Sequence, residues 1–265
     1  MTMVPLPQQV APHGYRRQAI AERFGRAAYT YDDNAAVQMI IAQHTQSPLV
    51  LEPRQRILDI GSATGRQTSQ LATAVNEVVG VDISQAMVTA ATQRYPQLTF
   101  VQGDAEALPF PSASFDCVYS SMALQWVASP ARALSEINRV LRSGGCAHLA
   151  IMVAGSLHEL VLARQLAGMA PSVNTLFSAE TWRLALADLP LRILSQREKC
   201  YRDPHENMRS LLRSITKVGA GLSFTGEKST PLGRRNLQAL EQAFPKDPQG
   251  QLSVSYQVLH LILEK

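Results

Sequence analysis

This chain of 265 residues has few cysteines, lacks long apolar runs and carries only a small excess of charge of one sign. Cys117, Cys146 and Cys200 lie far apart and form no C-x-x-C pair, which argues against a disulfide framework or a zinc site. The His residues form no spaced set of metal ligands. No stretch reaches the roughly 18 apolar residues of a membrane span, and no signal peptide is visible. The net charge of +4 is scattered, so we expect a soluble cytoplasmic protein with no nucleic-acid or membrane partner.

The hydrophobic content of 46% is enough for a sizeable core, and the length favours one α/β domain with additions. Residues 1–16 are rich in proline and lack hydrophobic periodicity, which predicts a flexible lead-in. Between 17 and 47 the apolar spacing suits two helices broken near residues 29–34, and we interpret this segment as an N-terminal helical flap. Residues 48–265 are expected to form the main domain.

Short β-rich runs alternate with helical stretches after residue 53, a pattern typical of a parallel sheet flanked by helices. The expected strands are 56–60, 78–82, 99–102, 115–120 and 146–153, with helices at 67–74, 85–94 and 130–141. Alternating runs at 191–201 and 252–263 predict the last two strands of the same sheet. Helical insertions are expected at about 155–190 and 204–247, with helices at 157–167, 179–187, 205–217 and 233–243.

A glycine-containing loop follows the first expected strand, where Asp59, Gly61, Ser62 and Gly65 precede a helix. Gly61 and Gly65 allow a sharp turn and a close approach to a ligand. The start of the helix offers free N–H groups and the positive end of its dipole. A strand-to-helix turn without a ligand remains the alternative for this loop taken alone.

The second and third strands end in carboxylates. Asp82 and Ile83 end the second strand, where a carboxylate can accept hydrogen bonds from both ribose hydroxyls of a nucleoside. An ordinary helix cap is the alternative for Asp82. Asp104 and Ala105 end the third strand, where a carboxylate and a main-chain N–H can meet the edge of an adenine.

The fourth strand ends at Ser120 and leads through Ser121 to Gln125 and Trp126. In an open α/β sheet, ligands bind outside the carboxyl ends of the strands. We therefore expect all these strand ends to face one site.

In this order the motifs resemble those of the class I S-adenosylmethionine-dependent methyltransferases, over about residues 56–153. The resemblance implies a Rossmann-like α/β fold: a seven-stranded, mostly parallel sheet with helices on both faces. It also implies S-adenosylmethionine as methyl-donor cosubstrate. The family often has D-x-G-x-G-x-G, whereas the middle glycine here is Ala63. The G-x-G-x-x-G pattern of dinucleotide-binding proteins is absent.

The same resemblance assigns a role to each part of the donor site. It places Asp59 near the methionine end, Gly61, Ser62 and Gly65 in the loop, Asp82 at the ribose, Asp104 with Ala105 at the adenine, Ser120 on the sulfonium side and Gln125 in a lid. Ile83, next to Asp82, is counted among the residues that bind the donor.

Two segments outside this core are similar to the malonyl-acyl-carrier-protein O-methyltransferases of biotin synthesis. The first is the flap sequence from Phe24 to Asp32. The second, L-R-S-I-T-K-V-G-A at 212–220, is similar to the family's M-R-S-L-K-x-I-G-A and places the arginine of that motif on Arg213. A competing register places it on Arg209.

This second resemblance implies methyl transfer to the free carboxylate of a malonyl thioester, carried by acyl-carrier protein or by coenzyme A. Arg213 would hold the carboxylate, with Arg209 in reserve, and Tyr31 would close the pocket from the flap. A carboxylate is already ionised at neutral pH, so no general base is needed. Because acyl-carrier proteins are acidic, docking by basic side chains is expected at Arg16, Arg17, Arg23 and Arg26, or at Lys228, Arg234 and Arg235.

Other interpretations stay open at this point. Both arginines are also compatible with a solvated helix face, and Tyr31 with core packing. The enzyme alternative is a methyltransferase for another small carboxylic acid or a quinone-like or polyketide-like acceptor. A noncatalytic module that binds S-adenosylmethionine is the third hypothesis. The sequence does not determine the oligomeric state.

Overall fold

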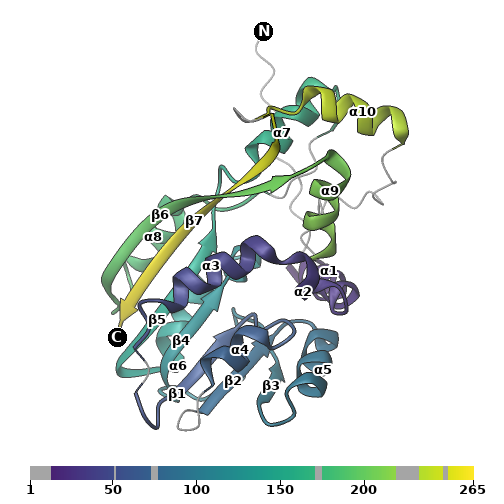
Figure 1. Ribbon diagram of the computed structural model, residues 1–265. Helices are drawn as coiled ribbons and strands as arrows, with labels where there is room; N and C mark the ends of the chain where they lie inside the picture. The colour runs from purple at the N-terminus through teal and green to yellow at the C-terminus, as the bar shows by residue number, and fades with distance from the viewer. Residues whose placement is uncertain (1–12, 51, 73–76, 171–174, 219–232, 247–249) are drawn as a thin grey trace.

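The computed structural model describes residues 13–265 apart from 51, 73–76, 171–174, 219–232 and 247–249. Seven strands form one sheet in the order β3-β2-β1-β4-β5-β7-β6 (Figure 1). The parallel part consists of β1 (Arg56–Ile60), β2 (Glu77–Asp82), β3 (Thr99–Gln102), β4 (Phe115–Ser121) and β5 (Leu141–Met152). Strand β7 (Leu252–Glu264) runs antiparallel to both of its neighbours, β5 and β6 (Arg192–His205). The expected seven-stranded, mostly parallel sheet is confirmed.

Helices connect the strands, and further helices precede β1 in the chain. In chain order they are α1 (His13–Ala27), α2 (Tyr31–Asn34), α3 (Ala36–Gln46), α4 (Arg66–Leu71), α5 (Gln85–Arg94), the short 3₁₀ helix η1 (Leu124–Trp126), α6 (Pro130–Val140), α7 (His158–Leu166), α8 (Ala179–Leu186), α9 (Met208–Lys217) and α10 (Arg234–Ala243). Several begin at side-chain caps: Ser84 caps α5, Ser129 caps α6 ahead of Pro130, and Asn207 forms a capping box at α9.

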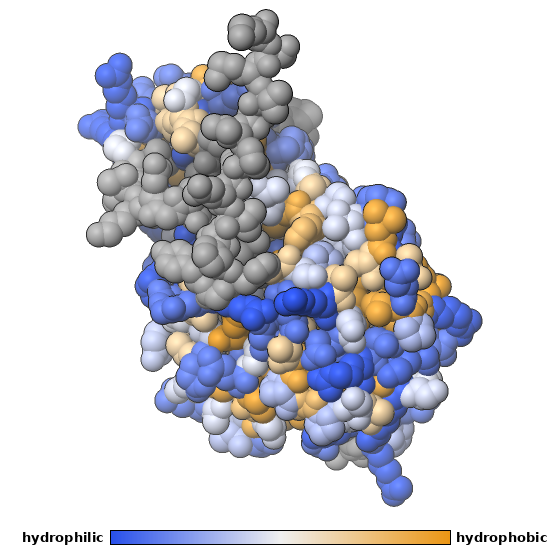
Figure 2. All heavy atoms as spheres, turned by 180° about the vertical axis from the view of Figure 1, so that it is seen from behind, coloured by the Kyte–Doolittle hydropathy of each residue, from blue (hydrophilic) through white to orange (hydrophobic). Residues whose placement is uncertain are grey.

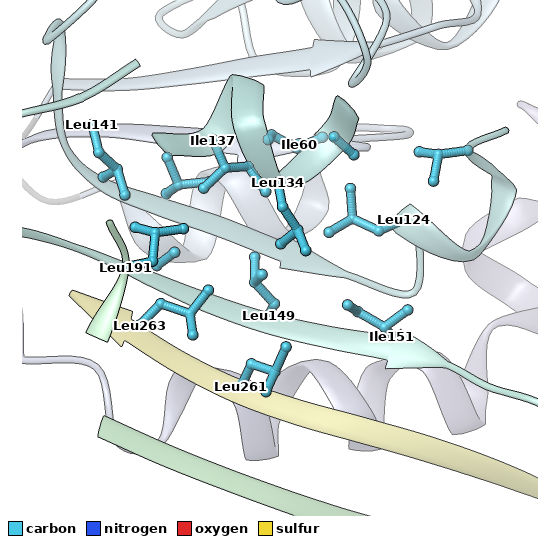
Figure 3. Close-up of a cluster of buried hydrophobic side chains, with 14 of the residues drawn as sticks. Ile60, Leu124, Leu134, Ile137, Leu141, Leu149, Ile151, Leu191, Leu261 and Leu263 are labelled. Carbon is cyan, nitrogen blue, oxygen red and sulfur yellow. The ribbon is translucent and has the colours of Figure 1, made fainter. Parts of the chain in front are cut away.

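Alternation along the strands sends apolar side chains to both faces of the sheet. Leu58 of β1 belongs to the largest buried cluster, which α6 and α8 cover, whereas Ile57 belongs to a cluster on the opposite face with Leu71 of α4. Figure 3 shows how Leu134 and Ile137 of α6 lie over the strands of this largest cluster. The sheet is therefore buried by helices on both faces, as a parallel sheet requires.

The fifth strand begins at Leu141, five residues before its expected start at Cys146. Leu141 pairs with Phe115 and Cys146 pairs with Cys117, so the register shifts between these two pairs. Gly144 has a φ of 75° within this bulge. Gly144 and Gly145, which follow the expected helix at 130–141, therefore lie inside an irregular strand.

The flap also differs from the expected pair of helices. Helix α1 begins at His13, before residue 17, and the polar stretch expected to be a break contains the one-turn helix α2. Residues 1–12 of the expected lead-in lie outside the described residues. The division into lead-in, flap and main domain remains a prediction.

Helices α7, α9 and α10 gather at the end of the sheet toward which the parallel strands point (Figure 1). On the opposite side of the molecule, apolar atoms gather where α8 and β6 lie, as the rear view of Figure 2 shows. Leu184, Ile193 and Leu194 are exposed there. Among the described helices, none is long and apolar enough to cross a membrane.

Candidate functional site

The loop between β1 and α4 is built around two left-handed glycines. Gly61 has a φ of 79°, and a Cβ atom on it would lie 2.1 Å from the Cβ of Ala123. Gly65 has a φ of 80° and starts α4 beside the ring of Phe100. Ala63, which stands where the resemblance has its middle glycine, is also left-handed, with a φ of 46°. The loop therefore keeps the backbone path of a glycine-rich turn, at the cost of strain at Ala63.

The carboxylate of Asp82 is fixed at the end of β2 by the backbone of this loop. One oxygen accepts a hydrogen bond from the main-chain N–H of Ala63 and the other from that of Ser84, both at 2.9 Å. Burial raises the pKa of Asp82 to about 6, although the two N–H donors oppose the shift. Each oxygen keeps a further lone pair, so the carboxylate is positioned to accept two hydroxyl groups of a ligand.

Asp59 lies beneath the loop. It is buried and accepts a hydrogen bond from the Thr68 hydroxyl at 2.7 Å, which ties β1 to α4. Burial raises its pKa to about 7; the Thr68 hydroxyl opposes this shift and the nearby charge of Asp82 adds to it. Asp59 lines neither of the two cavities described below, so the structure gives it a supporting position.

The first cavity lies over the carboxyl ends of β1, β2 and β3. It brings together six of the predicted site residues: Tyr31, Gly61, Asp82, Ile83, Asp104 and Ala105. Its other walls come from helix α1 and from the segment after β4, with Arg17, Ile20, Phe24, Met122, Trp126 and Val127. Apolar walls with carboxylates at two strand ends suit a nucleoside.

Helix α1 covers this cavity. The rings of Phe24 and Trp126 meet edge to face, with their centroids 5.5 Å apart. Asp104 accepts a hydrogen bond from the main-chain N–H of Glu106 at 2.8 Å and forms an ion pair with Arg17 at 2.7 Å.

A second cavity lies on the other side of Tyr31, under α2 and α3. Tyr31, Gly61 and Ala63 line both cavities. The second is otherwise lined mainly by polar groups, among them Gln38, Ser62, Arg66 and Ser121. The buried Oε1 of Gln38 and the buried Oγ of Ser62 find no hydrogen-bond partner among the described residues. Buried polar atoms without partners beside a cavity indicate that a polar ligand group completes them.

Tyr31 lies between the two cavities and lines both. Its neighbour Asp32 binds two side chains outside the flap. Asp32 accepts a hydrogen bond from the Thr64 hydroxyl at 2.8 Å and forms an ion pair with Arg94. Burial, followed by the charges of Asp82 and Asp32, raises the pKa of Tyr31 well above its ordinary value. The phenol is therefore neutral and available as a hydrogen-bond donor.

Several predicted residues lie outside both cavity linings. Ser120 is fully buried and donates to the carbonyl of Ile60 at 2.9 Å, and the Gln125 amide donates to the carbonyl of Met122 at 2.7 Å. These contacts fix the segment after β4. Gly65 starts α4 and Asp59 lies below the loop, so both shape the site from behind.

Arg209 and Arg213 project from the exposed face of α9. The opposite face of this helix buries Met208, Leu211 and Ile215. Neither arginine is in the lining of these two cavities. Helix α9 nevertheless adjoins the flap, since the Thr30 hydroxyl donates to the main-chain carbonyl of Lys217 at 3.3 Å.

Three residues of the site were missed by the sequence interpretation. Arg17 was grouped with docking side chains, while Glu106 and Arg66 were not singled out. Arg17 lies 87 positions before Asp104 in the sequence, and no periodicity links them. Among the residues that the structure describes, no group of His, Cys, Asp and Glu side chains is arranged to hold a metal ion.

Comparison with known proteins bears on this site. A family described as methyltransferase domain matches residues 58–149. The biotin biosynthesis bifunctional protein BioHC of Cellvibrio japonicus is 36% identical over 253 residues, which cover 94% of this chain and 50% of that protein. The chain thus spans half of that relative. The malonyl-[acyl-carrier protein] O-methyltransferase of Erwinia billingiae is 33% identical, with 94% of this chain and 98% of that protein covered.

Solved structures share the fold at lower sequence identity. The YcgJ protein from Bacillus subtilis matches with a TM-score of 0.61 and 18% identity, covering 86% of this chain and 98% of that one. A geranyl diphosphate methyltransferase in complex with GPP and sinefungin matches with a TM-score of 0.53 and 15% identity, covering 87% of this chain and 77% of that one.

Proposed function

Because this chain belongs to the malonyl-[acyl-carrier protein] O-methyltransferases, we propose that it transfers a methyl group from S-adenosylmethionine to the free carboxylate of malonyl-acyl-carrier protein. The product is the methyl ester of the malonyl thioester, formed early in biotin synthesis. The observation that carries the proposal is the pair of neighbouring cavities that share Tyr31, Gly61 and Ala63 in their linings, with the carboxylate of Asp82 fixed in the wall of the first. The three free thiols fit a reducing cytoplasm, where we place the enzyme.

The first cavity fits the nucleoside of the donor. Asp82 would accept hydrogen bonds from the two ribose hydroxyls, and Ile83 would pack against the adenine. Asp104 and the main-chain N–H of Ala105 would meet the adenine edge. Trp126 and Phe24 would cover the ring from the flap side.

The second cavity fits the amino-acid end of the donor. This end must continue past Gly61, which lines both cavities. The unpartnered Oε1 of Gln38 is an acceptor for the ammonium group. The Ser62 hydroxyl and the Arg66 guanidinium are donors for the carboxylate. Because Tyr31 lies between the two cavities, its hydroxyl would be close to the sulfonium centre.

The reaction is a direct displacement at the methyl carbon. A lone pair of the malonyl carboxylate forms the new O–C bond while the S–C bond breaks, and the sulfur keeps its electron pair as a neutral thioether. The nucleophile is ionised at neutral pH, so the protein needs no general base. An anion and a cation neutralise each other in the transition state, so a site that excludes water favours the reaction. The flap would exclude water from the site. Alignment of the carboxylate with the methyl group would lower the barrier further.

A cation near the flap would hold the malonyl carboxylate through one oxygen and leave the other free to attack. For this role we propose Arg213, with Arg209 in reserve, because an arginine fork pairs with carboxylates. Both side chains are exposed on α9, beside the flap. Access to the reacting methyl would therefore run between α9 and α2.

Docking of the acidic carrier would use exposed basic side chains. Arg26 is exposed at the end of α1, and Arg234 and Arg235 are exposed on α10. Arg17 pairs with Asp104 instead. Lys228 lies outside the described residues, as does the side chain of Arg16. Steep weakening of the carrier KM with salt is expected if these cations dock it.

A substrate panel tests the proposed acceptor. Initial rates of methyl transfer are compared for malonyl-acyl-carrier protein, malonyl-coenzyme A, acetyl-acyl-carrier protein and free small carboxylic acids. Turnover of the malonyl carrier with no turnover of the acetyl carrier is the expected result. Faster turnover of a free acid would contradict the proposal, and the malonyl-coenzyme A arm measures how much the carrier contributes.

A further inference from the structure

Arg17 ties helix α1 to the adenine end of the first cavity. Its Nε lies 2.7 Å from Oδ2 of Asp104, and its Nη2 lies 3.4 Å from Oε2 of Glu106. The Glu106 carboxylate is almost fully buried and also accepts a hydrogen bond from the main-chain N–H of Ala128 at 3.0 Å. One guanidinium on the flap therefore contacts the loop after β3 and, through Glu106, the segment that precedes α6.

The rest of α1 covers the cavity with apolar groups. Ile20 and Phe24 lie one and two turns after Arg17 and line the same cavity. The ring of Phe24 also meets that of Trp126, which lines the same cavity. Because α1 lies over part of this cavity, an outward movement of the helix would widen the exit for a nucleoside bound there.

The ion pair and the adenine act on the same carboxylate. In Asp104, Oδ1 accepts the N–H of Glu106 and Oδ2 faces Arg17. A carboxylate has about four lone-pair positions, so it can also accept from the exocyclic amine of adenine. The charge of Arg17 and the N–H of Glu106 hold the carboxylate in the orientation that the adenine amine needs, so α1 closure and adenine binding should favour each other.

We infer that Arg17 is a positioning residue that sets how long the donor and its demethylated product stay bound. This inference rests on the donor site proposed above, with the nucleoside in the first cavity. It moves Arg17 from the carrier-docking group, where its charge would have to be free, to the adenine end of the donor site. The Arg17 side chain is 36% exposed, so solvent and salt reach the ion pair and moderate its strength.

The experiment measures dissociation of S-adenosylhomocysteine from the whole protein by stopped-flow tryptophan fluorescence, since Trp126 lines the cavity. Arg17→Gln is compared with wild type and with Arg26→Gln, a matched control that removes the same charge from the exposed end of α1. We expect Arg17→Gln to raise the dissociation rate about fivefold, with little change in the association rate and none in Arg26→Gln. High salt should accelerate dissociation from wild type and leave Arg17→Gln nearly unchanged.

Two further variants keep the inference falsifiable if Arg17→Gln folds poorly. Arg17→Lys keeps the charge and should give an intermediate rate. Glu106→Gln keeps an acceptor for Ala128 and removes one of the two acids, so it should raise the rate less than Arg17→Gln.

Three outcomes would overturn the inference. If Arg17→Gln lowers only the melting temperature and leaves the dissociation rate unchanged, the ion pair is purely structural. If Arg26→Gln has the same effect as Arg17→Gln, general charge is responsible. In both cases the protein still binds S-adenosylhomocysteine, so the proposed function is not contradicted. If wild type binds no S-adenosylhomocysteine, the proposed donor site fails together with the inference.

Discussion

The main-chain N–H of Ala63 donates a hydrogen bond to the carboxylate of Asp82 over 2.9 Å. This contact joins the loop after β1 to the end of β2, the two strand ends that meet the nucleoside in our account. The backbone at Ala63 that donates it is left-handed, with a φ of 46°. The same residue, Ala63, therefore both orients the Asp82 carboxylate and carries the backbone strain of the loop.

The affinity for S-adenosylhomocysteine should depend on the ionisation of Asp82. Burial raises its pKa to about 6, and only the ionised form can accept from both ribose hydroxyls. The dissociation constant should therefore fall about tenfold as the pH rises from about 5 to 7, and then level off. Isothermal titration calorimetry across this range checks it. Asp82→Asn should bind weakly at every pH, whereas Asp188→Asn, on an exposed loop, should retain the wild-type profile. A flat wild-type profile would contradict this role.

Glycine at position 63 should be tolerated or stabilising. A left-handed alanine costs about 1–2 kcal/mol, while glycine loses about 0.5–1 kcal/mol of backbone entropy on folding. The free energy of unfolding of Ala63→Gly should therefore rise by up to about 1 kcal/mol, measured by urea denaturation. Ala72→Gly, at an ordinary φ of −70°, should instead lower it. A clear loss of stability in Ala63→Gly would show that the loop carries no strain at this residue.

Tyr31→Phe should impair catalysis more than folding. The ring keeps its packing between the two cavities, but the hydroxyl that would face the sulfonium side is lost. A buried hydrogen bond contributes about 1 kcal/mol, so kcat/KM should fall about fivefold. Tyr29→Phe is the matched control on the flap, because Tyr29 is 89% exposed. Unchanged kinetics in Tyr31→Phe would remove the hydroxyl from the mechanism.

Arg213→Ala should weaken the use of the malonyl thioester without affecting the donor. Loss of a hydrogen bond to a charged group costs about 1.5–3 kcal/mol, so kcat/KM for the malonyl carrier should fall at least about tenfold. The affinity for S-adenosylhomocysteine should stay constant, since Arg213 lines neither donor cavity. Arg209→Ala, one turn away on the same face, is the comparison. If Arg213→Ala turns over normally and Arg209→Ala does not, the competing register is the right one.

The sheet and much of the donor site could be predicted from the sequence because their signals are local. The alternation of strands and helices fixed the positions of β1 to β4 to within a residue. Gly61, Asp82 and Asp104 each follow a strand, and a parallel sheet brings the carboxyl ends of neighbouring strands to one edge. Their common cavity follows from this topology.

The rest depends on contacts between distant segments. Arg17 meets Asp104 because α1 folds back over the sheet, and no local pattern encodes that packing. The early start of β5 depends on a bulge opposite β4, where glycines that suit a helix end also suit an irregular strand. The sequence left the direction of the Arg213 side chain open between the site and a solvated helix face, because a motif gives the residue and not where its side chain points.

The most direct test of the account is the intact mass of malonyl-acyl-carrier protein after incubation with the purified enzyme and S-adenosylmethionine. The account predicts a gain equal to one CH₂ group on the malonyl carrier, reversed by mild ester hydrolysis, and no gain on the acetyl carrier. A gain on both carriers, or a gain that ester hydrolysis does not remove, would contradict methylation of the free carboxylate.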